Sequence, residues 1–488
     1  MKISSLPDTA ISLTIASLAA TLIIPPAAAE PFQDPYPPSV HVAPGDNAPP
    51  TPKPAETLTS HQSPSPLAPD AVTADWPHLL GANYNLTTPE SPLQTTYPES
   101  GPPLVWEVAR GAGFAPPVIK YPFLVHIFRA GPNTEAVECL HPETGHRYWR
   151  HEYNTEHITN FGIDDSARAS PTIDGECVYT LGVNSVLHCF QLSSGHIFWS
   201  RDLKSEFTTP HNFFGQGASP LVHKNLVILN LGGRDNLTVV AFDKKSGETQ
   251  WAARHTWGAS YASPIPASFH GKDRILVFAG GESRPPHGGL LVIDPADGSI
   301  LSSTPWRAEM YASVNAASPV LVGENQAFIS EAYTQGGALL EFNADNSTNI
   351  IWKAPRFGAQ FSTPVLFQDH LYGFDGSSSP GATFVCYDAA TGTEKWRDQK
   401  LQVGRANLLA ASAPGVFFCL GEHGEFLTLK PQPDSAKILA QAQLFNAPDT
   451  FSPPVLSHGL LFIVQGRPDT KTNTTPRLLC YDLRPPAD

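Results

Sequence analysis

Short apolar runs separated by turn residues repeat along most of the chain, from about residue 75 onward. Residues 169–199 show one unit of this pattern, ASPTIDGECVYTLGVNSVLHCFQLSSGHIFW. The runs are rich in valine, leucine, phenylalanine and tyrosine, and each is only a few residues long, as β-strands are. No long stretch has the 3.6-residue period of an amphipathic helix. The pattern therefore predicts an all-β protein.

Two markers recur in step along these runs. The first is a small residue, a polar residue and a proline, with its prolines at Pro117, Pro171, Pro220, Pro264, Pro319, Pro364 and Pro453 and a degenerate copy expected near residues 411–414. The second is a strand carrying tryptophan, at Trp106, Trp149, Trp199, Trp251, Trp306, Trp352 and Trp396. The intervals of about 41–55 residues between proline steps are typical of one four-stranded propeller blade.

The two markers do not match in number. Eight proline steps accompany seven tryptophan strands, the first tryptophan strand precedes the first step, and the last blade ends without one. We therefore predict an eight-bladed β-propeller of four-stranded blades, in which residues 104–108 form the outer strand of the last blade. This closure leaves no open seam. Blade seven, residues 407–445, departs most from the repeat, and its boundaries stay open.

Several tryptophan strands follow a turn with glycine, as in HPETGHRYW, QLSSGHIFW, DKKSGETQW and DAATGTEKW. Glycine supplies the positive φ angle that a tight hairpin turn requires. Asp294 and Asp297 in IDPADGS occupy the same turn, so we interpret them as turn residues and not as a calcium site. Their side chains are expected to accept hydrogen bonds from nearby backbone amides.

The N-terminal part differs in composition from the repeats. Lys2, the apolar residues 10–24 and Ala27–Ala29 are typical of an export signal, so residues 1–29 are predicted to be a signal peptide and the protein periplasmic or secreted. Residues 30–74 are rich in proline and are expected to be a disordered linker. The propeller is assigned to residues 75–488, where no apolar stretch is long enough to predict a transmembrane helix.

The net charge and the cysteine positions further limit which class of protein this is. The formal net charge is −14, and no cluster of lysine and arginine forms a basic face, which argues against a nucleic-acid partner. Cys139, Cys189, Cys386 and Cys480 stand at equivalent strand positions, which favours buried thiols. A disulfide between Cys177 and Cys189 is an alternative, because their strands are predicted to be neighbours.

The combination of small-Ser-Pro, V-Y-x-L-G, L-x-C-F/L-D and T-G-x-x-x-W resembles the PQQ-like propeller repeat. The segment DWPHLLGANYN, Asp75 to Asn85, adds a likeness to bacterial exported PQQ-binding-like propeller proteins. The family includes quinoprotein alcohol dehydrogenases and the BamB subunit of outer-membrane protein assembly. The resemblance covers about residues 75–485 and implies the fold. It also implies that the tryptophans lock neighbouring blades and do not contact a quinone.

A quinoprotein dehydrogenase would, by this resemblance, hold PQQ and Ca²⁺ at the central axis and carry an adjacent cysteine pair. The chain has no such pair and no haem-attachment motif. Asp164 and Asp165 precede an inner strand, where an axial metal ligand could lie, but a solvated loop explains them as well. His141, His146, His151 and His157 lack the spacing of metal ligands. No catalytic or metal-binding residue is assigned.

One set of candidate site residues remains. The segments before the innermost strands of a propeller converge on one rim of the channel, and here they carry aromatic, amide and basic side chains. These are Phe161, Arg168, Asn212, Phe214, Trp257, Tyr261, Tyr311, Asn315, Phe361, Arg405 and Asn407. Such a ring can bind a ligand or peptide, or it can simply pack the channel mouth.

The main hypothesis is a non-catalytic, exported and monomeric propeller that binds a protein segment or a small ligand at this rim. Two alternatives stay open. The first is a quinoprotein dehydrogenase that depends on PQQ and Ca²⁺. The second is a BamB-like factor for outer-membrane protein assembly. The outer strands of the blades could also accept an added strand from a partner.

Overall fold

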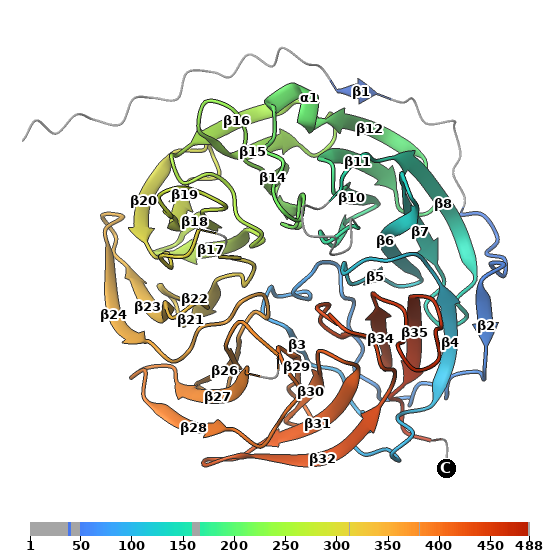
Figure 1. The fold of residues 1–488 in the computed structure, drawn as a ribbon. Coiled ribbons are helices and arrows are strands. Elements are labelled where there is room, and N and C mark those ends of the chain that lie inside the picture. The colour runs from blue at the N-terminus through green and yellow to red at the C-terminus, as the bar shows by residue number, and fades with distance from the viewer. Residues whose placement is uncertain (1–37, 41–48, 159–165, 312, 380, 487–488) are drawn as a thin grey trace, which may run out of the picture.

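The computed structural model describes residues 38–40, 49–158, 166–311, 313–379 and 381–486. In this part of the chain eight sheets stand in a ring, as Figure 1 shows. Each sheet has four strands of the repeat, ordered from the channel outward, so the predicted eight-bladed β-propeller is confirmed. The described residues contain one short helix, α1 (Leu203–Phe207).

The strands of the first four blades, from inner to outer, are as follows. Blade one has β5 (Val118–Lys120), β6 (Phe123–Gly131), β7 (Thr134–Leu140) and β8 (Arg147–Asn154); blade two has β9 (Thr172–Asp174), β10 (Cys177–Leu181), β11 (Val186–Gln191) and β12 (Ile197–Asp202). Blade three has β13 (Leu221–His223), β14 (Leu226–Asn230), β15 (Leu237–Asp243) and β16 (Thr249–Arg254); blade four has β17 (Ile265–Phe269), β18 (Lys272–Ala279), β19 (Gly289–Ile293) and β20 (Ile300–Pro305).

The remaining blades follow the same order. Blade five has β21 (Val320–Val322), β22 (Gln326–Glu331), β23 (Gly336–Phe342) and β24 (Thr348–Ala354); blade six has β25 (Val365–Phe367), β26 (His370–Asp375), β27 (Thr383–Asp388) and β28 (Glu394–Asp398). Blade seven has β29 (Asn407–Ala411), β30 (Val416–Leu420), β31 (Glu425–Pro431) and β32 (Ala436–Gln443); blade eight has β33 (Val455–Ser457), β34 (Leu460–Gln465), β35 (Arg477–Asp482) and β4 (Leu104–Ala109). Middle strands such as β30 are buried throughout, whereas outer strands such as β16 alternate between buried and exposed residues.

The proline steps form a hydrogen-bonded belt around the channel. The backbone N–H of Ser170 donates to Oγ of Ser219 in the next blade at 2.9 Å, and the N–H of Ser219 donates to Oγ of Ser263 at 2.8 Å. Further round, the N–H of Ser318 donates to Oγ1 of Thr363 at 3.0 Å. The prolines stand just before the inner strands, where a missing N–H costs no ladder hydrogen bond. The motif therefore joins blade two to three, three to four and five to six.

Replacing Ser219 with alanine is expected to lower the free energy of unfolding by about 1–3 kcal/mol, because it leaves the buried N–H of Ser170 without its acceptor. Urea unfolding followed by tryptophan fluorescence measures the change. Ser100→Ala, in an exposed turn, is the control and should change stability by less than about 0.5 kcal/mol. Equal effects of both substitutions would contradict a structural role for the belt.

The tryptophan strands lock neighbouring blades, as the family resemblance implied. Nε1 of Trp149 donates to the carbonyl of Leu192 in the next blade at 2.8 Å, and the ring lies over Gly195 of that blade's turn. A Cβ atom at Gly195 would lie 2.5 Å from the Trp149 ring, and its φ angle is +73°. The same arrangement joins Trp199 to Gly247. Glycine is thus required here both by the turn and by the tryptophan of the preceding blade.

Two details of the predicted repeat are wrong. Trp306 lies after β20 and is out of register, because Ser302 occupies the strand position that tryptophan holds elsewhere. The degenerate proline step is not at residues 411–414, which span the end of β29 and the turn toward β30. Instead Asn407 begins the inner strand β29, and its side-chain amide donates to the carbonyl of Phe451 in blade eight at 3.1 Å. Blade seven thus reaches its neighbour through an asparagine in place of a serine.

The ring closes as predicted, through β4. This strand pairs antiparallel with β35, with Trp106 opposite Cys480. Nε1 of Trp106 donates to the carbonyl of Pro142 in blade one at 2.8 Å, and Arg477 forms an ion pair with Glu107 at 2.5 Å. The last blade is therefore completed by a strand from the N-terminal part of the chain.

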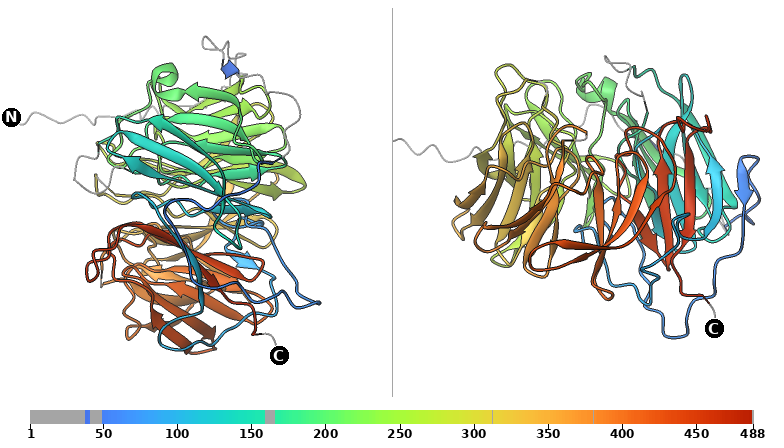
Figure 2. Two further views of the ribbon diagram at one scale, coloured as in Figure 1. Left: turned by 90° about the vertical axis from the view of Figure 1, so that its right-hand side faces the viewer. Right: turned by 60° about the horizontal axis from the view of Figure 1, so that its bottom comes forward.

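The described N-terminal residues differ from the expectation of a linker through residue 74. Strand β1 (Ser39–Val40) pairs with β12, and β2 (Leu58–Ser60) pairs with β4, both antiparallel. Between them Lys53 forms a bridge with Arg147 at the edge of β8. In both views of Figure 2 the blue N-terminal segment lies against the outside of the cyan and red blades. Proline-rich chain can pair at a sheet edge because only some of its N–H groups are needed there.

Residues 76–88 cross the channel at the end opposite to the proline belt. Trp76 forms a bridge with Ile119 in β5, and the carbonyl of Pro77 accepts from the N–H of Ile173 in β9. The segment then pairs through β3 (Thr87–Thr88), in parallel, with the end of β29. It appears in Figure 1 as the blue segment inside the ring near β3. Because Trp76 is almost fully buried, this segment packs as part of the core.

The six cysteines are all free thiols, and Cys177 is the least buried of them. The prediction of buried thiols at the four equivalent strand positions is confirmed, and the alternative disulfide between Cys177 and Cys189 is not formed. Cys177 lies opposite Gln191 in the ladder, whereas Cys189 lies opposite Tyr179. Among the described residues no helix has the length and apolar character needed to span a bilayer.

Candidate ligand-binding site in the central channel

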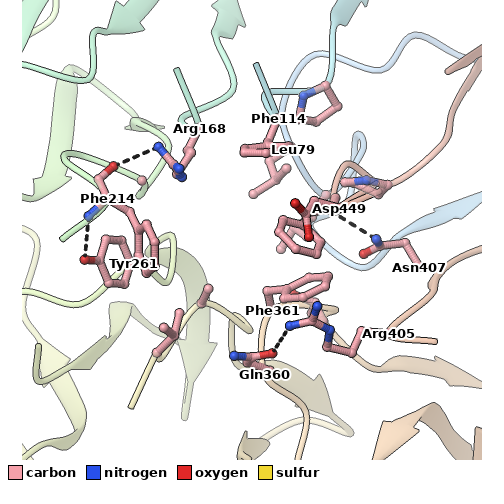
Figure 3. Close-up of a pocket in the computed structure, with 18 of the residues that line it drawn as sticks. Leu79, Phe114, Arg168, Phe214, Tyr261, Gln360, Phe361, Arg405, Asn407 and Asp449 are labelled. Atoms are coloured by element: carbon pink, nitrogen blue, oxygen red, sulfur yellow. Dashed lines mark hydrogen bonds between the residues drawn. The ribbon is translucent and has the colours of Figure 1, made fainter. Parts of the chain in front are cut away.

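A cavity of about 430 Å³ occupies the channel at the rim that carries the proline belt. All eight connections that lead into the inner strands contribute to it (Figure 3). Seven aromatic rings line its wall among the described residues. They belong to Phe114, Phe213, Phe214, Tyr261, Tyr333, Phe361 and Phe451.

The floor of the cavity is apolar. It is formed by Leu79, Leu80 and Leu86 of the segment that crosses the channel. Leu80 and Leu86 are buried, and the N–H of Leu86 donates to the carbonyl of Leu80 at 2.8 Å. His78 stacks on Tyr84 with 3.9 Å between ring centroids, and burial lowers the pKa of His78 to about 4, so it is neutral at pH 7. The site is therefore a pocket with one mouth and not an open channel.

Arg168 stands on one side of the pocket between two phenylalanine rings. Its guanidinium carbon lies 5.3 Å from the centroid of Phe114 and 5.1 Å from that of Phe214. The guanidinium also donates to the carbonyls of Ser166 and Phe214 at 3.0 and 3.1 Å. Cation–π contacts and backbone hydrogen bonds together fix this side chain in one orientation.

Arg405 occupies the opposite side, as Figure 3 shows, in a matching arrangement. Its guanidinium carbon lies 5.4 Å from the centroid of Phe361 and 5.0 Å from that of Phe451. Glu422 pairs with this guanidinium, and Nη1 donates to Oε1 of Gln360 at 2.9 Å. Burial alone would raise the pKa of the Glu422 carboxyl, but the hydrogen bonds from Arg405 hold this pKa below its usual value. The ion pair is therefore maintained at neutral pH.

Two further polar groups stand in the wall. The hydroxyl of Tyr261 donates to Glu282 and accepts the N–H of Phe214 at 3.2 Å, and burial together with Glu282 raises the Tyr261 pKa well above its usual value. Asp449 is the one carboxylate among the described residues that line the cavity, and its Oδ2 lies 3.0 Å from Arg467. Its φ angle is +59°, in the left-handed region that few residues other than glycine adopt.

Six of the predicted site residues lie together in the cavity wall: Arg168, Phe214, Tyr261, Phe361, Arg405 and Asn407. Four others do not line it. Asn212 belongs to a turn closed by Gly215, Trp257 packs against the core between blades three and four, and Tyr311 stacks under Arg284. Asn315 is buried and caps the Gly280 carbonyl at 3.2 Å. Phe161, like Asp164 and Asp165, lies outside the described residues.

Sequence reasoning missed part of the wall and all of the floor. Phe114 and Phe451 precede the proline steps of blades one and eight by a few residues, as Phe361 does in blade six, so the same rule could have found them. No such sequence pattern marks the residues that form the floor of the cavity. Leu79 and Leu80 stand in the segment that carried the family resemblance, and nothing in their pattern shows that it turns into the channel.

Among the described residues, the wall offers too few oxygen ligands for a quinone held on a calcium ion. Calcium takes six to eight oxygen ligands, several of them carboxylates. The one carboxylate among the described lining residues, Asp449, already pairs with Arg467. Elsewhere in the described chain, no three histidine, cysteine, aspartate or glutamate side chains gather as a metal site would require. We therefore derive no step through PQQ or Ca²⁺.

Fold and site together define a closed propeller that carries a blind aromatic pocket at one end of its channel. The sequence model of the family described as outer membrane protein assembly factor BamB matches residues 133–398, which is more than half of the chain. The protein belongs to this family. No curated protein matches its sequence.

Solved structures show the same fold at low sequence identity. BamB from Moraxella catarrhalis is 13% identical with a TM-score of 0.53, and the match covers 79% of this chain and 98% of that one. Quinohemoprotein alcohol dehydrogenase from Comamonas testosteroni is 12% identical with a TM-score of 0.57, over 85% and 81% of the two chains. The computationally designed Ika8 protein is 11% identical with a TM-score of 0.50, over 78% and 100%. At such identities the likeness shows the fold alone.

Proposed function

We propose that this protein is a non-catalytic binding module that holds a protein segment or a small ligand in the pocket of its channel. The observation that carries the proposal is the blind cavity of about 430 Å³, which lies within the range of binding sites for small molecules and anchoring side chains. Its walls are largely apolar, and the polar groups in them are held by hydrogen bonds and ion pairs. A rigid apolar wall binds apolar groups because little order is lost when the ligand enters.

The proposal places the protein in the periplasm or outside the cell, working as a monomer. The predicted signal in residues 1–29 and the description of the family as an outer membrane assembly factor support this location. The family description also favours a second candidate, a role in outer-membrane protein assembly, in which the pocket would receive part of a protein partner. Both candidates use the same pocket.

Titration with N-phenyl-1-naphthylamine, an uncharged aromatic dye that brightens in apolar sites, tests the pocket. We expect one dye per protein, and about tenfold weaker binding after Phe361→Ala or Phe451→Ala, because each substitution removes a wall of the cavity. Tyr121→Ser removes an exposed aromatic side chain that does not line the cavity. This substitution should leave dye binding unchanged.

A parallel assay separates the binding module from an enzyme. PQQ and Ca²⁺ are added to the purified protein, and reduction of a redox dye is followed with alcohols and sugars. No turnover is expected. Stoichiometric quinone binding with turnover would contradict the proposal, as would dye binding that survives both phenylalanine substitutions.

A further inference from the structure

Exposed apolar residues stand in the same connections whose other residues line the cavity. Met310 is 50% exposed and Ile158 is 66% exposed. Tyr311 stands edge-on to Phe213, which lines the cavity, with 6.0 Å between ring centroids. His157, next to Ile158, stacks on His211 at 4.9 Å, two residues before Phe213. We name Ile158, Phe213, Met310 and Tyr311 the apolar collar, which spans the connections into blades two, three and five.

The apolar collar contains a residue type that is rare in this chain. Met310 is one of only two methionines in the sequence, and the other is Met1. Methionine is flexible and polarizable, and it is favoured on surfaces that adapt to different apolar partners. Beside it, the guanidinium of Arg284 lies 3.9 Å from the centroid of Tyr311 and holds that ring at the rim. A large apolar side chain exposed beside a pocket marks a contact surface more often than an isolated one does.

The size of the cavity and the position of the collar constrain the occupant. A small molecule enclosed in about 430 Å³ would fill the cavity and leave Met310 and Ile158 in water. A longer chain can fill the cavity with one group and cover the collar with its neighbours. Few residues then supply most of the affinity, with one apolar anchor in a pocket and flanking contacts that exclude water.

The polar groups of the wall distinguish between a peptide and a lipid chain. Asp449 and the amide of Gln360 stand among the aromatic rings, and the Asp449 carboxylate can only accept hydrogen bonds when ionised. Each peptide residue other than proline carries an N–H donor. An acyl chain offers none, so burying it against Asp449 would remove water from the carboxylate and leave it only the ion pair with Arg467.

We propose that the occupant is an extended segment of another protein, which inserts one large apolar side chain into the cavity and lays its flanking residues on the apolar collar. This inference rests on the proposed function and specifies the ligand class of the same pocket. It assigns the cavity to the anchor side chain and Met310 to the flanking residues.

Four probes test this with the full-length protein: a blocked nonapeptide with a central phenylalanine and flanking leucines, the same peptide with a central alanine, N-acetylphenylalanine amide, and monolauroylglycerol as a lipid. Calorimetry or fluorescence anisotropy gives their affinities. The phenylalanine peptide should bind at least about tenfold more tightly than each of the other probes, since only it can use both the cavity and the collar.

Two variants separate the cavity from the collar. Phe451→Ala should weaken the peptide and the amide alike, because it removes a wall of the cavity. Met310→Ser should weaken the peptide about threefold to tenfold and leave the amide unchanged, because the side chain is half exposed and outside the cavity. Met310 supports no core, so the variant is expected to fold, and circular dichroism checks this.

The possible results of these measurements test the inference and the proposed function separately. Equal affinity for the peptide and the amide, or a peptide affinity that Met310→Ser does not change, would overturn the inference while the dye titration still supports a binding pocket. Monolauroylglycerol binding more tightly than the peptide would assign the pocket to lipids and also overturn it. If neither the dye nor any peptide binds the unsubstituted protein, the proposed function fails together with the inference.

Discussion

Gly195→Ala is expected to destabilise the propeller by about 3 kcal/mol or more. Alanine at a φ angle of +73° costs about 1–2 kcal/mol. The added Cβ would also lie 2.5 Å from the Trp149 ring, so the tryptophan that locks blades one and two must shift. Overpacking of this kind typically costs a further 1–3 kcal/mol or so. The midpoint of urea unfolding measures the total.

Gly175→Ala is the matched control for this prediction. Gly175 lies in the same blade and has a φ angle of +61°, but a Cβ there meets nothing within 4 Å. Its substitution should therefore cost only the backbone contribution, about 1–2 kcal/mol. The difference between the two variants isolates the contact with Trp149. Equal losses would mean that the tryptophan packing does not constrain the turn.

Glu135→Gln is expected to remove a large part of the pH dependence of stability. Burial raises the pKa of the Glu135 carboxyl to about 7 from its model-compound value of 4.5, partly opposed by hydrogen bonds from the N–H of Val183 and the hydroxyl of Tyr153 and by the charge of Arg129. The unfolded chain loses this proton near pH 4.5, whereas the folded protein keeps it to about pH 7. Because the unfolded state binds fewer protons in that window, stability falls as the pH rises through it.

Glutamine cannot ionise, and its amide oxygen can accept the same two hydrogen bonds. The stability of Glu135→Gln relative to the unsubstituted protein should therefore rise by about 3 kcal/mol between pH 4.5 and 7, then stay level. Urea unfolding at a series of pH values measures this difference. Glu152→Gln, at an exposed position of β8, should show no such change. Parallel pH profiles for the unsubstituted protein and Glu135→Gln would show that Glu135 ionises normally in the fold.

The repeat made the architecture predictable. Its markers are contacts between blades: the Ser219 hydroxyl and the Trp149 ring each bind the neighbouring blade, so their spacing reports the blade length directly. Where a blade makes the contact differently, the prediction failed. Asn407 replaces the serine step in blade seven, and Ser302 stands where blade four would carry tryptophan.

The site was only partly predictable, for a related reason. Residues just before the inner strands converge on the rim, and this placed Arg168 and Arg405 correctly in the pocket wall. The rule gives position along the chain but not side-chain direction, so Asn315 points into the loop structure and Tyr311 stays on the rim. The floor depends on long-range packing of Leu80, which no local pattern reveals.

The closing strand also has a consequence for the order of events during synthesis. Glu107 of β4 and its partner Arg477 are 370 positions apart in the chain. During synthesis β4 emerges early, and although one of its edges can pair with β2, the edge that joins β35 has no partner until the last blade exists. Contacts of such long range make folding slow, and unpaired edges promote aggregation. The completed ring is therefore the last state reached, and a chain cut short before β35 would lack the sheet that β4 must join.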